Sequence, residues 1–402
     1  MSLTKVTNSM ISGAIVNVID FGAIGDGVTD DSSAIQNAID SIEYGQIVFE
    51  PKIYNLENTG ITLSAGKQLL GQTSKGTRFL YSGTGKAITA GDGINLAYGL
   101  AIKNISIIIS SDTGIGLWSR SLCGADISDL YIEGHGGSAR NVGILIDGDS
   151  QSGFFSTYRN IICNHINIGF KFIGGSTAGS YTTEDHFIAC SSLGDSAASS
   201  IGIDVHPSSG GAPCGLNSVW IGGNMESCGI GIRFRGTGHM TFNGMRFEAN
   251  TTDIQYDLYS LVNTFISCQN IGTIIDNSGT GFGGHTYISC TDGSSEVKNN
   301  IFNTSIFTSY KTTDVPITSK GYPASSANLY EARNGSNNLM FSIANDGSIN
   351  TLNSIDVSIL TTSSGTPEGR IVAPKGSICT DTDTGKLYVK ESGSGNTGWV
   401  VK

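Results

Sequence analysis

Two glutamates stand at matching positions of a repeated pattern. Glu226 comes six residues after Trp220, and Glu248 comes six residues after Phe242; each of these aromatic residues begins a similar apolar segment. If the repeats stack as strands, residues at the same offset become neighbours about 4.8 Å apart. Cleavage of a glycosidic bond needs a carboxylic acid and a carboxylate, which lie about 5 Å apart in retaining enzymes. We therefore predict Glu226 and Glu248 as a catalytic pair. The alternative is that each Glu bonds a neighbouring turn.

Other polar and aromatic residues near the repeats are candidates for catalysis or sugar binding. Asp185 is a candidate acid or base, and His186 beside it is a candidate sugar ligand. Both precede an apolar segment, so a turn or a cap is the alternative role for them. Trp220 and Tyr256 are candidates for stacking on sugar rings. Trp220 begins a segment with the apolar pattern of the core, so the alternative for this residue is burial.

Three arginines lie between Glu226 and Glu248 in the sequence. Arg233, Arg235 and Arg246 could bind acidic sugars, because a guanidinium pairs with a carboxylate through two parallel hydrogen bonds. The alternative is that they neutralise Glu226 and Glu248. We predict Arg233 and Arg246 as substrate-binding residues.

The sequence gives no motif for a metal or a cofactor. None of the eight cysteines lies in a CxxC pair, and we predict them as small buried apolar side chains. Asp26, Asp30 and Asp31 fit a turn and a helix cap better than a calcium site. The sequence contains no P-loop and no GxSxG motif, which disfavours a nucleotide site and a serine esterase.

A short pattern repeats through the middle of the chain. It consists of an aromatic or apolar triplet, a small residue, a polar stretch and a Gly-Ile-like segment. Copies begin at Asn160, Phe187, Trp220, Phe242, Phe265 and Tyr287, and from Phe187 the steps are 33, 22, 23 and 22 residues. Short strands at this period predict one coil of a right-handed parallel β-helix per repeat, in which neighbouring coils bury each other's inner face. A leucine-rich repeat would fit the period, but the leucine frame is absent.

The alignment of these repeats predicts an interior column and a surface loop. The column contains Cys190, Gly223, Met245, Cys268 and Cys290. The longest repeat carries an insertion at residues 191–215, which we expect on the surface.

Both ends of the chain differ from the repeats. Asp30 and Asp31 precede apolar residues at positions 34, 35, 38, 39 and 42, which predicts a helix that covers the first coil, followed by strands at Ile47–Glu50 and Ile61–Leu63. After about residue 300 the repeat stops. Hairpin signals at Asn334-Gly and Asp346-Gly, and strand-like segments at 386–389 and 399–401, predict a small β module joined through residues 351–366. We therefore predict an N-terminal attachment segment at 1–16, a β-helix at 17–300 and a C-terminal trimerisation or tip module at 301–402.

Composition and charge exclude several kinds of partner. The net charge is −11 and there is no basic stripe, which argues against nucleic acid and anionic membranes as partners. No apolar run reaches the length that crosses a bilayer. The N-terminus lacks the features of a secretory signal, so we expect folding in a cytoplasm. Only 14% of residues are charged, and the many hydroxyl and amide side chains suit sugar ligands.

Two motifs near the N-terminus carry a resemblance to a known superfamily. The segment at 18–31, with sequence VIDFGAIGDGVTDD, and the following AIQNA at 34–38 resemble the opening of the pectate-lyase-like superfamily. This resemblance implies a right-handed β-helix with an N-terminal cap helix. It does not imply lyase chemistry, because one fold hosts several activities.

Both ends of the sequence also resemble bacteriophage tail proteins. Residues 3–11 are similar to the segment that precedes this motif in enterobacterial tailspikes. Residues 365–369, 374–377, 387–393 and 397–399 are similar to the C-terminus of many phage tail proteins. Large tailspikes usually carry an N-terminal particle-binding domain, whereas only about 16 residues precede the motif here, so we expect attachment to the phage tail or to a partner spike through residues 1–16.

The tailspike resemblance implies a function, a location and an assembly. We expect a homotrimer on the virion tail that acts at the bacterial surface. Its expected activity is endo-glycosidic cleavage of a capsular or O-antigen polysaccharide, without a metal or another cofactor. The alternatives are a receptor-binding spike without catalysis and a polysaccharide lyase that uses Arg or Tyr as base.

Overall fold

The computed structural model describes most of the first three quarters of the chain and its C-terminal end. The described residues are 15–135, 140–148, 151–174, 182–206, 214–236, 239–257, 263–277, 285–291, 297–298, 301–302, 330–333, 339–343, 349–350 and 360–402. The chain divides into two compact units, Met1–Ser305 and Ile306–Lys402. The predicted attachment segment lies outside the described residues except for its end, where Val16 already pairs with Ile47 in the first unit.

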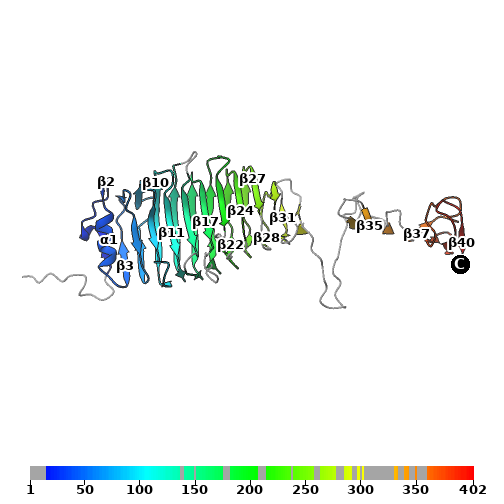
Figure 1. Ribbon diagram of the computed structural model, residues 1–402, viewed down its shortest axis with the longest axis horizontal. Helices are drawn as coiled ribbons and strands as arrows, with labels where there is room; N and C mark the ends of the chain where they lie inside the picture. The colour runs from blue at the N-terminus through cyan, green and yellow to red at the C-terminus, as the bar shows by residue number, and fades with distance from the viewer. Residues whose placement is uncertain are drawn as a thin grey trace, which may run out of the picture. The chain divides into compact units, whose positions relative to one another are not determined.

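The first unit is a stack of coils, and it confirms the predicted right-handed parallel β-helix (Figure 1). Sheet A comprises β1 (Val16–Asn17), β2 (Asp26–Asp30), β3 (Gly45–Val48), β4 (Ile53–Asn55), β6 (Lys67–Leu70), β7 (Arg78–Tyr81), β10 (Ala101–Ile109), β13 (Asp126–Glu133), β16 (Thr157–Asn164), β19 (His186–Ile188), β20 (Ser191–Leu193), β22 (Val219–Ile221), β23 (Asn224–Glu226), β25 (Thr241–Asn243), β26 (Arg246–Glu248), β28 (Thr264–Ile266), β30 (His285–Ile288) and β33 (Ile301–Phe302). Apart from β33, which pairs antiparallel with β30, these strands pair in parallel with the coils on either side.

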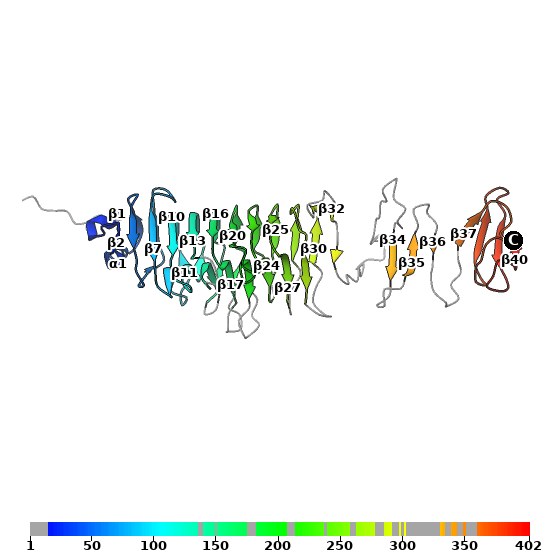
Figure 2. The ribbon, with the colours of Figure 1, turned by 90° about the horizontal axis from the view of Figure 1, so that it is seen from above.

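Two further sheets contribute to the coils, and the shorter of them, sheet C, has only four strands among the described residues. Sheet B comprises β5 (Ile61–Leu63), β8 (Lys86–Ala90), β11 (Ile115–Arg120), β14 (Val142–Asp147), β17 (Ile168–Ile173), β21 (Ile201–His206), β24 (Ile230–Phe234), β27 (Thr252–Tyr256) and β29 (Ile274–Asp276). Sheet C comprises β9 (Ala97–Tyr98), β12 (Leu122–Cys123), β15 (Gly153–Phe154) and β18 (Thr182–Thr183). In the view from above, β16 and β20 of sheet A lie along one side of the stack, and β17 and β24 of sheet B lie along the other (Figure 2). At the end of the stack, β31 (Cys290–Thr291) and β32 (Val297–Lys298) form an antiparallel pair.

A column of residues in the left-handed conformation bends sheet A into two arms. It runs through Asn104, Asp129, Asn160, Ala189, Gly222, Gly244, Ser267 and Ser289, all with φ between 51° and 69°. The first arm precedes this corner in each coil, as β19 and β22 do, and the second arm follows it, as β20 and β23 do. Because several members of the column are not glycine, a sequence pattern of glycines does not reveal the corner.

Aromatic residues fill the interior behind the first arm. Tyr158, Phe187, Trp220, Phe242 and Phe265 occupy consecutive coils in one register. Their rings stack, with centroids 4.5 Å apart for Phe187 and Trp220 and 4.9 Å apart for Phe242 and Phe265. Such buried rings supply much of the apolar area that holds neighbouring coils together.

The register confirms the predicted interior column and corrects one repeat. Pairs on either side place Cys190, Gly223 and Met245 in one column, and Cys268 and Cys290 continue it, with the four side chains buried. The copy predicted to start at Asn160 is wrong by two residues, because Tyr158 pairs with Phe187 while Cys163 pairs with Ser192. The error comes from aligning Cys163 with Cys190, whereas Cys163 pairs with Ser192.

A helix covers the N-terminal end of the stack, as the sequence predicts. A 3-10 helix, η2 (Val18–Phe21), leads to α1 (Ser32–Asp40), which buries Ile35, Ala38 and Ile39. The Gln36 amide donates to the Thr62 carbonyl oxygen and accepts from the Thr62 N–H, so it satisfies the open edge of sheet B at β5. Within the described residues, no helix has the length and hydropathy needed to cross a bilayer.

Asp30 and Asp31, which were predicted to cap α1, have different hydrogen-bond partners. Asp31 is the N-cap residue, but its carboxylate bonds no helical N–H. It accepts instead from the backbone N–H groups of Ile24, Gly25 and Asn55, which ties the VIDFGAIGDG loop to β4. The Asp30 carboxylate accepts from the Ser32 N–H at the start of the helix.

The second unit contains sheet E. Its strands are β34 (Tyr330–Arg333), β35 (Leu339–Ile343), β36 (Ile349–Asn350), β37 (Leu360–Ser363), β38 (Ile378–Asp381), β39 (Leu387–Lys390) and β40 (Trp399–Val401). The antiparallel pairings β34–β35 and β35–β36 flank the two predicted hairpin turns, whose Asn334-Gly and Asp346-Gly residues lie outside the described residues. The predicted strands at 386–389 and 399–401 are present as β39 and β40.

Candidate functional site

The predicted glutamate pair lies side by side on the outer face of the second arm. Glu226 ends β23 and Glu248 ends β26, and the two residues pair directly in register. Met225 and Phe247, the middle residues of these two strands, are buried. Because side chains alternate along a strand, both glutamates point to the surface. Adjacent strands lie about 4.8 Å apart, so the two carboxyl groups can face one glycosidic bond.

Each carboxylate of the pair has one polar side-chain partner. The Asn224 amide donates to Glu226 Oε2 at 2.9 Å. Arg246 lies 3.1 Å from Glu248 Oε2, with 51% of the Arg246 side chain and 39% of the Glu248 side chain exposed. Asn224 and Arg246 are themselves paired in register, so the four residues form a compact polar patch. We call these four residues the glutamate patch.

The outer face of the second arm continues toward the N-terminus through a shallow hollow. Register pairs connect Glu226 through Leu193 and Asn164 to Glu133. Beside Glu133 lies a hollow of about 330 Å³ lined by Lys75, Arg78, Ser106, Ile108, Tyr131 and Glu133. Partial burial and the Glu133 charge raise the pKa of Tyr131, against a hydrogen bond from Asn164 that lowers it. Tyr131 is therefore a poor base, which disfavours a lyase that would use it.

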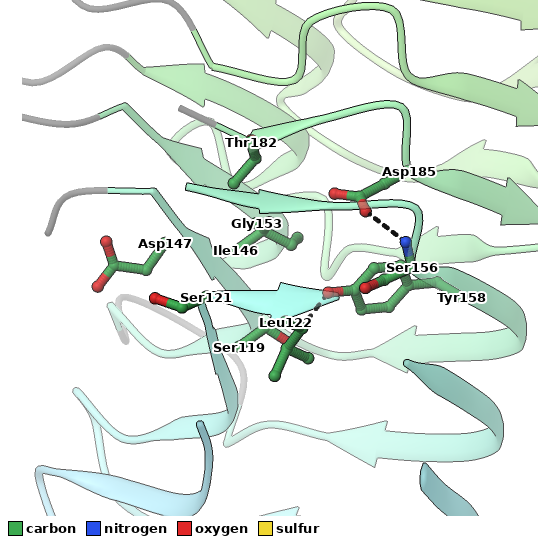
Figure 3. A pocket seen from close by; sticks show the side chains of 10 residues that line it. All are labelled: Ser119, Ser121, Leu122, Ile146, Asp147, Gly153, Ser156, Tyr158, Thr182 and Asp185. Atoms are coloured by element: carbon green, nitrogen blue, oxygen red, sulfur yellow. Dashed lines mark hydrogen bonds between the residues drawn. The ribbon is translucent and has the colours of Figure 1, made fainter. Parts of the chain in front are cut away.

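Asp185 lies inside the β-helix, so its prediction as a catalytic group for a polymer is wrong. Its exposed fraction is 3%, and it lines an interior cavity of about 10 Å³ (Figure 3). The Ser156 N–H donates to Asp185 Oδ1 at 2.9 Å, and the Tyr158 hydroxyl nearby donates to Ser119. Burial raises the pKa of Asp185 to about 7, because the one backbone hydrogen bond only partly compensates for lost hydration. A polysaccharide does not reach this carboxyl.

The two predicted stacking residues are also interior. Trp220 is 0% exposed and stacks between the aromatic rings of neighbouring coils. Tyr256 is 1% exposed, and its hydroxyl lies 2.8 Å from that of Tyr287. The prediction that these residues bind sugar is therefore wrong, because alternation places both on the inner face of their strands.

The predicted arginines separate to two faces. Arg246 belongs to the glutamate patch, whereas Arg233 lies on the outer face of sheet B, where it bonds Asp204. Arg235 bonds the same carboxylate. Neither Arg233 nor Arg235 therefore neutralises Glu226 or Glu248.

His186 is exposed but lies on the first arm. It pairs in register with Thr157 and Val219, on the other side of the left-handed corner from the glutamate patch. The fold thus gathers Glu226, Glu248 and Arg246 in one patch and places His186 and Arg233 on other faces.

The cysteines are free thiols, and seven of them are buried, as predicted for small apolar side chains. Cys123 is partly exposed. Within the described parts of the chain, no group of three or more His, Cys, Asp or Glu side chains has a metal-binding arrangement.

Trp118, an aromatic residue on the outer face of sheet B, is not among the residues predicted from the sequence. Trp118 lies between Leu117 and Ser119, which are both buried, so alternation alone turns it outward. The Lys86 ammonium and the Arg120 guanidinium lie 4.1 and 4.2 Å from its ring centre, and its Nε1–H donates to Asp147 at 2.8 Å. With its ring held by two cations, Trp118 stabilises this face.

The fold defines this protein as a pectate-lyase-like β-helix. A family model described as "Rhamnogalacturonase A/epimerase, pectate lyase-like" matches residues 15–233. The match covers more than half of the chain, and the chain therefore belongs to this family. No curated protein has a sequence significantly similar to this chain.

Solved structures of other proteins share this fold. The Agl-KA catalytic domain is 15% identical with a TM-score of 0.52, and the match covers 72% of this chain and 54% of that chain. The tailspike gp49 of Acinetobacter baumannii bacteriophage Fri1, described as a capsular polysaccharide depolymerase, is 12% identical with a TM-score of 0.52; the match covers 72% of this chain and 57% of gp49. At these identities, the likeness establishes the β-helix fold.

Proposed function

We propose that this protein is a phage tailspike that binds and depolymerises a bacterial surface polysaccharide, either a capsule or an O-antigen, by endo-glycosidic hydrolysis. The observation that carries the proposal is the direct register of Glu226 and Glu248 on the outer face of a pectate-lyase-like β-helix. The likeness to a capsule depolymerase tailspike supports the fold on which this patch stands.

The two glutamates have different surroundings, which suggests different roles. Glu248 faces the Arg246 guanidinium, so we assign it the role of the ionised carboxylate, as nucleophile or base. Glu226 has the neutral Asn224 amide as its bonded partner, and we assign it the role of general acid. Both side chains are partly exposed, so the bound polymer must supply the desolvation that strengthens this chemistry.

The test compares the size of the polysaccharide after incubation with the native protein and with two variants. The native protein should reduce the size, and the variants should leave it unchanged. Capsule and O-antigen from a panel of enterobacterial hosts are incubated with the protein and separated by gel filtration. Glu226→Gln and Glu248→Gln should each lower the cleavage rate by about 10²–10⁴-fold while binding is retained. Glu43→Gln, an exposed glutamate beyond α1, is the matched control and should cleave normally. Full activity in both Glu226 and Glu248 variants would refute the assignment.

A receptor-binding spike without catalysis is the second candidate. It is favoured by the bonded partners of both carboxylates and by the open surface on which they lie. Its signature is retention of the protein on bacteria whose polysaccharide keeps its full size. A lyase would instead release an unsaturated product that absorbs in the near ultraviolet.

We also propose that the protein acts as a homotrimer on the virion tail, attached through residues 1–16. An outward column on the first arm supports contact with other copies, because Ile188, Ile221, Asn243, Ile266 and Ile288 pair in register along it. Ile221 is 45% exposed and Ile288 is 46% exposed. An apolar strip of this kind is typical of an interface. A monomer by light scattering would contradict the trimer.

A further inference from the structure

A larger hollow lies on the outer face of sheet B. Its volume is about 660 Å³. Its floor includes the first residues of three consecutive strands, Val142, Ile168 and Ile201, which pair in register. We call this hollow the sheet B groove.

The sheet B groove is lined by positive charge. Arg140, Lys171, Arg233 and Arg235 line it, and none of the described residues in its lining is acidic. Asp204 bonds both Arg233 and Arg235, and its exposed fraction is 0%. Four cations and one carboxylate leave a net formal charge of +3 in a chain whose net charge is −11. Such a local reversal of sign attracts an anionic ligand.

The Asp204 carboxylate holds both guanidinium groups in fixed orientations. Arg233 donates through Nε and Nη2 to its two oxygens at 3.2 and 3.4 Å. Arg235 does the same at 3.2 and 2.6 Å. A guanidinium has five N–H donors, so each arginine keeps three for a ligand. The pair is therefore preorganised for a carboxylate or phosphate oxyanion.

The rest of the groove suits a sugar. The Asn167 amide is fixed by bonds to the carbonyl and hydroxyl oxygens of Ser199, and both residues line the groove. The aliphatic floor can contact the C–H face of a sugar ring, and the amide and hydroxyl can bond its hydroxyl groups. The described lining offers no aromatic side chain for base stacking, and the acidic chain as a whole repels nucleic acid.

The sheet B groove lies next to the glutamate patch along the chain. Only residues 227–229 separate Glu226, which ends β23, from Ile230, which begins β24. The floor residues Val142, Ile168 and Ile201 are likewise the first residues of their sheet B strands. A polymer that crosses this corner can contact both surfaces.

We infer that the sheet B groove binds the oxyanion substituents of an acidic polysaccharide, such as the carboxylate of a uronic or sialic acid or a phosphodiester, while the same chain passes over the glutamate patch. This inference rests on the proposed function and narrows it, since it requires the target capsule or O-antigen to be anionic. The experiment must therefore include neutral polymers as well.

The test measures binding and cleavage of a panel of purified neutral and acidic surface polysaccharides, with single-stranded DNA as a further polyanion. The variant is Arg140→Gln with Lys171→Gln, which removes two groove charges and leaves the Asp204 bonds intact. The matched control is Lys375→Gln with Lys386→Gln, which removes two exposed cations of the second unit. We expect the native protein to bind an acidic polymer. The affinity should fall about tenfold or more in the groove variant and about tenfold or more for the native protein at high salt. The control variant should bind with the native affinity.

The outcomes distinguish failure of this inference from failure of the proposed function. An acidic polymer whose binding depends on Arg140 and Lys171 supports the inference. Cleavage or binding of a neutral polymer, with the acidic ones ignored, overturns the inference and leaves the proposed function standing. An acidic polymer bound equally by the groove variant, or DNA bound in preference to it, also overturns the inference. No binding and no cleavage across the panel overturns both.

Discussion

Asp185, between β18 and β19, and Asp204, in β21, are both buried carboxyl groups, yet their pKa values shift in opposite directions. Asp185 faces the interior cavity with one backbone donor, and burial raises its pKa to about 7. Asp204 is covered by two arginines on sheet B. Burial tends to raise its pKa as well, but the bonds and charges of Arg235 and Arg233 outweigh burial and lower it.

The comparison shows that burial alone does not fix the charge of a carboxyl group. The number and charge of its donors decide whether the group is kept neutral or ionised. The interior of the stack offers hydroxyl and backbone groups, whereas the outer face of sheet B offers cations. Burial therefore raises the pKa of Asp185 inside the stack, whereas two arginines lower the pKa of Asp204 on the outer face of sheet B.

Removing both arginines should make Asp204 behave like Asp185. Arg233→Met with Arg235→Met keeps the carboxylate covered but leaves it without cations, at a cost of about 5 kcal/mol in the free energy of unfolding near neutral pH. In the native protein the lowered pKa of Asp204 contributes stability above the usual Asp range, which is lost as pH falls through the lowered value. In the variant, stability should instead fall as pH rises from 4 to 8. Urea unfolding at several pH values measures this, and an unchanged pH profile would contradict it.

Asp185→Asn should remove the penalty of the interior acid. Because the folded pKa is raised, the contribution of Asp185 to stability is full below about pH 4, declines as pH rises and is lost above about pH 7. Asn keeps an oxygen acceptor for the Ser156 N–H and carries no charge. At pH 8 the variant should therefore be more stable than the native protein, by up to roughly 4 kcal/mol, and the two should converge near pH 4. A loss of stability at pH 8 would show that Asp185 is held ionised.

The exposed glutamates should give the smallest change in stability. Glu226→Gln alters a partly exposed side chain with one amide partner, so the free energy of unfolding should change by no more than about 0.5 kcal/mol. The same variant is expected to lose cleavage. Thermal unfolding followed by circular dichroism provides the measurement. A large destabilisation would indicate a structural role for Glu226 instead.

Residue spacing was sufficient to predict the coil period, the cap helix and the register of Glu226 with Glu248. These follow from spacing, because stacked coils of equal length bring equal offsets together. The repeat also implies the burial of Trp220, because Trp220 occupies the same inward position of its strand as Phe187. Asp185 lies between β18 and β19, so strand alternation does not fix the direction of its side chain.

The corners of the coils and the side-chain contacts between coils could not be predicted from residue spacing. The corners interrupt the alternation, as at Ala189, where Phe187 and Cys190 both face inward although their residue numbers differ by an odd number, three. The bonds of Arg233 and Arg235 to Asp204 join β21 to β24 across coils, and the sheet B groove is shaped by residues from several coils. Such contacts depend on left-handed turns and on the directions of long side chains, and neither is encoded in residue spacing along a single strand.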